Sequence, residues 1–288
     1  MVNEYGYEQA DIFSELYPKF KITKPVRLIE LFAGIGSQAK ALKNLGVPFE
    51  HWKAVEIDKY AMASYNAVHG TDFQTTDIKD VHAADLDMRE RERYCYILTY
   101  SFPCTDLSLA GHMMGMDKGS GTRSSLLWEV ERILDECGRD LPHVLLMENV
   151  PQVIGQKNIN AFQEWRKKLE ELGYQNYAEL LNAADYGIPQ QRIRCFMVSL
   201  LGEYSYTFPK KQELKLMLKD MLDDEVDEQF YLTEEQLKYF IANDKAMRES
   251  GRGFRFEPAE RERENGEDDS DQNGSHGRCM DSRRSALK

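Results

Sequence analysis

One stretch decides the fold: Val26-Arg27-Leu28-Ile29-Glu30-Leu31-Phe32-Ala33-Gly34-Ile35-Gly36. It begins as a short apolar run and ends in a glycine turn, and Ser37 behind it is a residue type that caps helices. Glycine lets the backbone turn tightly and lets a ligand approach the helix N-terminus. The stretch therefore predicts a strand, a ligand-binding turn and a helix.

The same order of strand and helix repeats along the chain, which predicts a mostly parallel sheet with helices on both faces. We expect a Rossmann-like, doubly wound α/β fold. The predicted strands are 26–32, 52–57, a short strand ending near Asp77, 95–100, 143–147, 174–181 and 195–200. The predicted helices are 10–17, 37–46, 59–68 after an Asp58 cap, 124–137, 161–172, 214–222 and 234–241.

Composition narrows the function classes. The 288 residues are 42% hydrophobic and 30% charged, which is typical of a soluble globular protein. Neither a membrane-spanning apolar run nor an N-terminal export signal is present, and the five scattered cysteines fit no disulfide or metal pattern. We expect a cytoplasmic protein without a metal. The net charge of -12 argues against nucleic acid as a partner, although a local basic groove is compatible with it.

Three predicted strand ends carry residues suited to a nucleoside cofactor. The first is the glycine turn at 32–36. Glu56 ends the next strand, where a carboxylate accepts hydrogen bonds from ribose hydroxyls. Asp77 ends the third predicted strand, within reach of an adenine amino group. The order of the three favours a nucleoside site over a set of tight connections.

Cys104 follows Pro103 just after the fourth predicted strand, at the sheet edge where open α/β sheets place their ligands. A thiol there is a candidate nucleophile, active as the thiolate. Cys95, Cys137 and Cys195 are expected to be ordinary buried residues instead.

Two further motifs supply charged groups. Glu148-Asn149-Val150-Pro151 ends the fifth predicted strand and offers a carboxylate as an acid or hydrogen-bond partner. Arg192 and Arg194 enter the last predicted strand on one face, where paired guanidinium groups suit a phosphate or an anionic reaction centre. Taken singly, Glu148 fits a helix cap equally well, and the arginines fit an exposed basic edge.

Together and in this order, the motifs resemble the cytosine-5 DNA methyltransferases, over residues 26–202. The resemblance implies S-adenosyl-L-methionine as the methyl donor. It implies a cofactor pocket in which Glu56 holds the ribose and Asp77 the adenine amino group. The implied cofactor-binding residues are Phe32, Gly34, Ile35, Gly36, Glu56, Ile57, Asp77 and Pro103.

The resemblance also implies a mechanism. Cys104 adds to carbon 6 of cytosine, Glu148 hydrogen-bonds the ring at N3, and Arg194 with Arg192 stabilises the anionic adduct. The substrate is then duplex DNA with the target cytosine flipped out of the stack. Ser108 and Arg123 are candidates for phosphate contacts.

The chain departs from the family pattern in two places. Thr105 stands where the family commonly has glutamine. A target-recognition region and two final motifs have no recognisable counterpart. We predict an N-terminal extension at 1–24, a catalytic domain at 25–202, a short helical remnant at 203–256 and a disordered tail at 257–288.

Three origins of this C-terminal region stay open. In the first, the chain is the larger subunit of a split enzyme that a separate C-terminal subunit completes. In the second, its gene carries a frameshift near Glu257. In the third, it is an enzyme with a reduced recognition element. The abrupt change of composition near Glu257 favours a frameshift over a short enzyme.

Two alternative functions also stay open. One is a tRNA cytosine-5 methyltransferase, and the other is a non-catalytic subunit that binds nucleic acid or cofactor. The presence of Cys104, Glu148 and Arg194 together disfavours the second. The target sequence, a restriction partner and the oligomeric state do not follow from these motifs.

Overall fold

The computed structural model describes residues 17–104, 107, 115–221, 223 and 226–249. The chain divides into two compact units. Residues up to Leu180 with Arg194–Pro209 form the first, and Leu181–Ile193 with the residues from Lys210 on form the second. The predicted domain boundaries stay predictions. The predicted tail at 257–288 and all but the last residue of the predicted helix at 10–17 lie outside the described residues.

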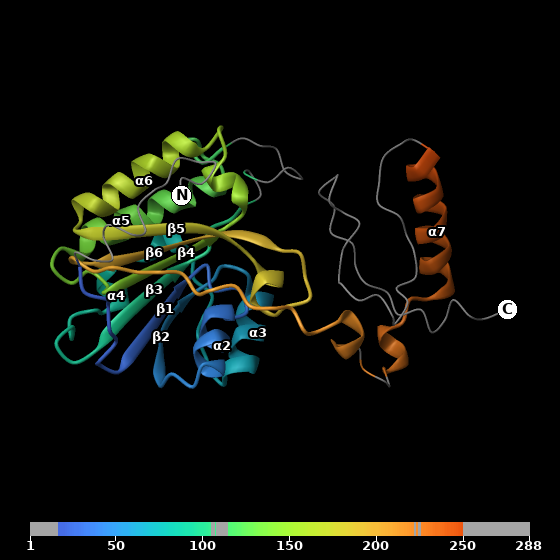
Figure 1. Ribbon diagram of the computed structural model, residues 1–288, viewed down its shortest axis with the longest axis horizontal. Coiled ribbons are helices and arrows are strands. Elements are labelled where there is room, and N and C mark those ends of the chain that lie inside the picture. Colours follow the sequence, from blue (N-terminus) through green and yellow to red (C-terminus); the bar gives the residue numbers. More distant parts are fainter. Residues whose placement is uncertain (1–16, 105–106, 108–114, 222, 224–225, 250–288) are drawn as a thin grey trace. The chain divides into compact units, whose positions relative to one another are not determined.

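The described residues form a six-stranded sheet in the order β2-β1-β3-β4-β6-β5. Strands β1, β2, β3 and β4 are parallel, and β6 runs antiparallel to β4. Helices α5 and α6 cover one face of the sheet, and α2 and α3 cover the other (Figure 1). The strands are β1 Val26–Leu31, β2 Phe49–Val55, β3 Cys95–Tyr100, β4 Val144–Asn149, β5 Tyr174–Asn182 and β6 Ile193–Leu201. The predicted doubly wound fold is confirmed.

Residues of the central strands alternate between two cores, as expected of a sheet covered on both faces. In β1, Ile29 and Leu31 join the larger cluster, which includes Trp165 and other residues of α5 and α6. Val26 and Leu28 point the other way and join a smaller cluster. Because β1 is buried along its whole length, the residues directly after it are held at a fixed edge of the sheet.

Most helices lie where the sequence predicts them, with shifted ends. Asp58 caps α3 by accepting hydrogen bonds from the first turn, as predicted. The residue before α2 is Gly36, so Ser37 is its first residue rather than its cap. The helices are α2 Ser37–Asn44, α3 Lys59–His69, α4 Ala83–Leu86, α5 Leu127–Cys137, α6 Ile159–Glu171 and α7 Glu234–Glu249.

Two predicted elements are wrong. Residues 71–77 form no strand; they lead irregularly into η1, a single 3₁₀ turn at Ile78–Asp80. Only one backbone hydrogen bond, from Thr76 N–H to Glu56 O at 2.9 Å, ties this segment to the end of β2. The predicted helix at 214–222 is replaced by irregular backbone and a 3₁₀ turn at Leu218–Met221.

The second unit contains α7 and short 3₁₀ turns. Among the side chains from 210 to 249 whose exposure the structure describes, none is buried. Several large apolar groups are exposed there, including Phe230 at 74% and Tyr239 at 67%. This part of the chain has no packed core of its own in the described residues.

Candidate active site

The turn after β1 has an unusual backbone. Phe32, Gly34 and Gly36 adopt left-handed φ values of 57°, 55° and 79°. That region is uncommon for a residue with a side chain and costs on the order of 1 kcal/mol, so Phe32 is held there by its surroundings. Two backbone hydrogen bonds fix the turn, from Ala33 N–H to Val55 O at 3.0 Å and from Gly36 N–H to Ala33 O at 2.9 Å.

The two glycines have different surroundings. A β-carbon on Gly36 would lie 2.3 Å from Nε2 of His69, so a larger residue requires the imidazole ring to move. A β-carbon on Gly34 would meet no atom within 4 Å. The space above Gly34 is thus open, and it lies two residues before the cap of α2, Gly36.

Glu56 follows β2 and joins two backbone segments. Its Oε2 accepts a hydrogen bond from Gly34 N–H and its Oε1 from Asp58 N–H, both at 2.9 Å. Each carboxylate oxygen accepts more than one hydrogen bond, so ribose hydroxyls can still bind. The carboxylate is therefore attached directly to the glycine turn.

Asp77 lies beside the same edge, because the neighbouring Thr76 N–H bonds to the Glu56 carbonyl. Its carboxylate caps η1. Ile35 and Ile57, which follow β1 and β2, are 58% and 67% exposed. Carboxylates, open space over a glycine and exposed apolar side chains together fit a nucleoside cofactor.

Cys104 is half-buried and packs against the main core at the carboxyl end of β3. The loop that carries it is held from two elements. Ser124 donates its hydroxyl to Pro103 O at 2.7 Å, and Asn149 donates its side-chain amide to Phe102 O at 3.0 Å. The end of β4 thus positions the cysteine loop.

The other cysteines named in the sequence are buried, as expected. Burial raises the pKa of Cys95 to about 11 and of Cys137 and Cys195 to about 12, so all three keep their protons at neutral pH. For Cys137 and Cys195, nearby carboxylates add to that effect. Such thiols are poor nucleophiles, which leaves Cys104 as the candidate among these four.

Glu148 and Arg194 are brought together by the antiparallel pairing of β4 and β6. The Arg194 Nε atom lies 3.2 Å from Glu148 Oε1, and the two side chains are 19% and 24% exposed. Asn149, next to Glu148, is one of the two residues that hold the loop of Cys104. The paired strands β4 and β6 therefore position three candidate groups: the Cys104 loop, the Glu148 carboxylate and the Arg194 guanidinium group.

Arg192 is placed differently from Arg194. It belongs to the second unit and its side chain is exposed. Its backbone N–H donates to Asn182 Oδ1 at 2.9 Å, and its carbonyl accepts from Ala183 N–H at 3.0 Å.

Of the candidate phosphate contacts, Arg123 is exposed in the segment before α5, whereas Ser108 lies outside the described residues. Thr105 also lies outside them.

A buried support under the glycine turn was missed in the sequence. Glu30 in β1 accepts hydrogen bonds from Tyr65 Oη at 2.6 Å and from Ala39 N–H in α2 at 3.2 Å. Burial raises the pKa of Glu30 despite these bonds. His69 lies 3.1 Å from Ile35 O. Tyr65 and His69 lie four residues apart, so a helix places them on one face. That spacing was the sequence signal that together they contact the glycine turn and the strand before it.

The described part of the chain contains neither a membrane-spanning helix nor a cluster of metal-ligating side chains. In those ranges, no helix is long and apolar enough to cross a membrane. No group of three or more metal-ligating side chains is found among the same residues.

A doubly wound sheet, with a glycine turn, carboxylates and a cysteine loop along its carboxyl edge, defines an enzyme of the open α/β class. Residues 26–286 match the family described as C-5 cytosine-specific DNA methylase, and the chain belongs to that family. This match confirms the resemblance noted in the sequence and continues beyond residue 202. The family and the fold imply the use of S-adenosylmethionine.

Individual relatives support the same family membership. Type II methyltransferase M2.ScrFI of Lactococcus lactis subsp. cremoris is 34% identical over 74% of this chain and 71% of its own length. Orphan methyltransferase M.SssI of Spiroplasma monobiae is 35% identical over 75% of this chain and 69% of its own length. Among solved structures, the S. pombe Dnmt2 methyltransferase has a TM-score of 0.58 and 25% identity, over 77% of this chain and 67% of that one.

Proposed function

We propose that this chain transfers a methyl group from S-adenosylmethionine to carbon 5 of cytosine in duplex DNA, through a covalent bond to Cys104. The observation that carries the proposal is that contacts at one sheet edge link the loop of Cys104, Glu148 and Arg194. Asn149 ties the loop of Cys104 to the end of β4, and Glu148 on that strand pairs with Arg194. The relatives named as type II and orphan methyltransferases support the reaction class.

Cytosine carbon 5 is a poor nucleophile until carbon 6 is attacked. The Cys104 thiolate forms a bond to carbon 6, and the electrons of the ring double bond make carbon 5 nucleophilic. Glu148, in its protonated form, donates a hydrogen bond to the ring at N3 and gives up that proton as negative charge builds there. Arg194, with Arg192 in support, stabilises the anionic adduct. After carbon 5 gains its methyl group, its proton passes to water, the electrons of that carbon–hydrogen bond re-form the double bond, and the sulfur leaves as the Cys104 thiolate.

The cofactor, when bound, supplies the methyl group. We assign its nucleoside to the edge formed by the glycine turn, Glu56 and Asp77. Gly34 leaves open space there, and Glu56 fixes the turn. The side chains assigned to the pocket are those of Phe32, Ile35, Glu56, Ile57, Asp77 and Pro103, with the backbone of Gly34 and Gly36.

The target base has to leave the helix stack to reach a half-buried cysteine. Arg123 is exposed and is proposed as a phosphate contact, as is Ser108. A cytoplasmic location stays a prediction.

We also propose that full activity needs a C-terminal part for target recognition. A longer form of this chain or a separate subunit would supply it. The described side chains from 206 to 249 form no buried core, and they leave Phe230, Tyr239 and Ile241 exposed. Such surfaces are typical of segments that become covered by a partner.

The test compares the parent with Cys104→Ser. Duplex DNA with 5-fluorocytosine at target positions traps the covalent adduct, because carbon 5 then carries no proton to lose. We expect a stable adduct and methyl transfer with the parent, in the presence of a complementing fragment if one is required. The serine variant is expected to show neither, with cofactor binding retained.

An adduct that persists in the serine variant would refute the role of Cys104. The same labelled-methyl assay on a tRNA pool tests the substrate class. Transfer to tRNA in preference to DNA would replace the DNA proposal with the RNA alternative.

A further inference from the structure

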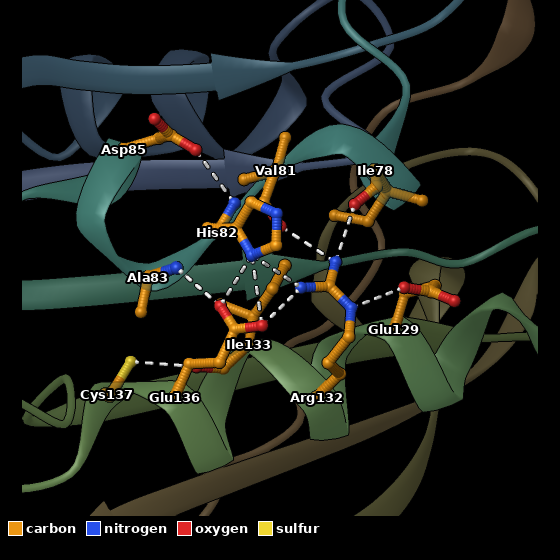
Figure 2. Close-up of polar contacts among 10 residues, drawn as sticks. All are labelled: Ile78, Val81, His82, Ala83, Asp85, Glu129, Arg132, Ile133, Glu136 and Cys137. Carbon is orange, nitrogen blue, oxygen red and sulfur yellow. Dashed lines mark hydrogen bonds and ion pairs between the residues drawn. The ribbon is translucent and has the colours of Figure 1, made fainter.

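A single arginine of α5 holds the turn that follows Asp77 (Figure 2). The Arg132 Nη2 atom donates to Ile78 O at 3.2 Å and to Val81 O at 2.8 Å. Its Nε atom donates to Glu129 at 2.8 Å. The guanidinium group therefore binds both ends of η1 and is itself oriented from its own helix.

Glu136, one helical turn further along α5, extends this contact. It accepts from Arg132 Nη1 at 2.7 Å, from Ala83 N–H at 3.1 Å and is paired with His82 Nδ1 at 3.1 Å. Partial burial opposes the ionised form, but the bonds from Ala83, Arg132 and His82 lower the pKa of Glu136 to about 2. Glu136 is therefore an anion at neutral pH, and it anchors the start of α4.

The held segment begins at the proposed adenine contact. Asp77 caps η1, and its Oδ1 accepts from Lys79 N–H at 3.0 Å. A three-residue 3₁₀ turn has little stability of its own, since it closes few hydrogen bonds. No strand precedes it, so the backbone of Asp77 takes its position from the Thr76 bond to Glu56 on one side and from the contacts of the turn on the other.

We propose that Arg132 is a positioning residue of the cofactor site. By binding the carbonyls of Ile78 and Val81, it fixes η1 so that the Asp77 carboxylate faces the adenine amino group of S-adenosylmethionine. This inference rests on the proposed function, because it assumes that Asp77 contacts the cofactor. Arg132 acts through Asp77 and touches no reacting atom.

The test is a double-mutant cycle on cofactor affinity, measured by calorimetry with S-adenosylmethionine. Arg132→Met removes the contacts with both carbonyls and keeps much of the side-chain volume. We expect it to weaken binding about tenfold in the parent, which corresponds to about 1.4 kcal/mol. In an Asp77→Ala background the same change should weaken binding less than about twofold, because coupled positions are not additive.

Two variants separate positioning from general stability. Arg132→Lys keeps one charged donor and should restore part of the lost affinity. Asp135→Asn is the matched control, because it removes a 2.7 Å ion pair of the same helix with Lys168 that does not involve η1. It should leave cofactor affinity within about twofold of the parent. Circular dichroism at the binding temperature checks that every variant is folded.

Each outcome has one reading. If the parent binds the cofactor and Asp77→Ala weakens binding, but Arg132→Met behaves like Asp135→Asn, the positioning role is wrong and the proposed function stands. Equal losses from Arg132→Met in both backgrounds would also overturn the inference. A parent that does not bind the cofactor, or whose binding is unchanged by Asp77→Ala, would overturn the proposed cofactor site and this inference with it.

Discussion

The Nε atom of Arg194 lies 3.2 Å from Oε1 of Glu148, across the antiparallel pair of β6 and β4. Neither side chain is fully exposed, so the attraction between them is screened less than that of a surface pair. The pair fixes the direction of a carboxylate next to the strand end that holds the cysteine loop. Once protonated, a carboxyl group held in this way can donate its hydrogen to the ring nitrogen N3 in one orientation.

We predict that Glu148→Gln lowers methyl transfer by about two to three orders of magnitude, because the amide cannot supply a proton at N3. The protein should stay folded and should bind the cofactor as before. Single-turnover transfer of labelled methyl groups measures the rate. Arg194→Lys, which keeps the charge but loses the planar fork, should cost less than Arg194→Ala. Unchanged transfer by Glu148→Gln would remove this carboxylate from the mechanism.

Two glycine substitutions should separate folding from binding. Gly36→Ala places a methyl group 2.3 Å from His69 Nε2 at a φ of 79°, so we expect it to lower the free energy of unfolding by about 2–3 kcal/mol. Gly34→Ala meets no atom within 4 Å and should cost only about 1 kcal/mol. Its methyl group would enter the space assigned to the cofactor, so affinity should fall instead.

Urea unfolding and cofactor calorimetry on both variants check this prediction. If Gly34→Ala binds S-adenosylmethionine as tightly as the parent, the open space above that residue is not part of the cofactor site. The two substitutions are matched controls for each other, because both introduce one methyl group at a left-handed position of the same turn.

The strand-to-helix order around this turn was predictable, because burial on both faces leaves near-continuous apolar runs in the central strands. β1 and β3, which are buried at every residue, follow that rule. Asp58 was recognisable as a helix cap from its residue type alone. These features depend on nearby sequence, which is why they could be predicted without coordinates.

The segment at 71–77 shows what such patterns miss. A strand was expected there from the alternation of strands and helices. Instead, Asn66 of α3 bonds the backbone of Phe73, Thr76 bonds Glu56, and the turn that follows is held by Arg132, about 50 residues away. The helix predicted at 214–222 failed because its apolar residues found no core to pack against; Leu216 is 45% exposed. Contacts across such distances in sequence have no local signal, so Arg132 was not predicted.

A third prediction concerns pH. His143 accepts a hydrogen bond from Tyr96 N–H at Nδ1, and burial, aided by Arg91 and Lys24, lowers the pKa of His143 to about 4. Between pH 6.5 and 4 the unfolded chain therefore binds a proton that the folded chain does not. Stability should fall as pH falls through that window, by roughly 2 kcal/mol after allowance for partial exposure.

Urea unfolding at pH 7.5, 6 and 5 measures this loss. His143→Gln keeps an acceptor for the Tyr96 N–H but cannot be protonated. It should have a flatter stability profile than the parent over the same pH range. Equal slopes for the two proteins would show that other groups cause the acid sensitivity.

The last prediction concerns the C-terminal part. We expect the 288-residue chain alone to show little or no sequence-specific methylation of duplex DNA. The chemistry is assigned to residues before 202, whereas the described side chains from 206 to 249 form no buried core that would hold a base-reading surface in place. With a net charge of -12, general attraction to phosphate is weak. Flipping a cytosine costs a few kcal/mol, and little would offset that cost.

Transfer of labelled methyl groups to mixed-sequence duplex DNA measures this activity, with the chain alone and with an added fragment. The fragment carries the target-recognition region and final motif of a relative such as M2.ScrFI, and it should restore activity where the two parts dock. A chain that lacks 257–288 is the control, and it should fold and respond to the fragment as the parent does, because that segment has almost no apolar residues to bury. Robust site-specific methylation by the chain alone would show that residues 203–256 are a working recognition element after all.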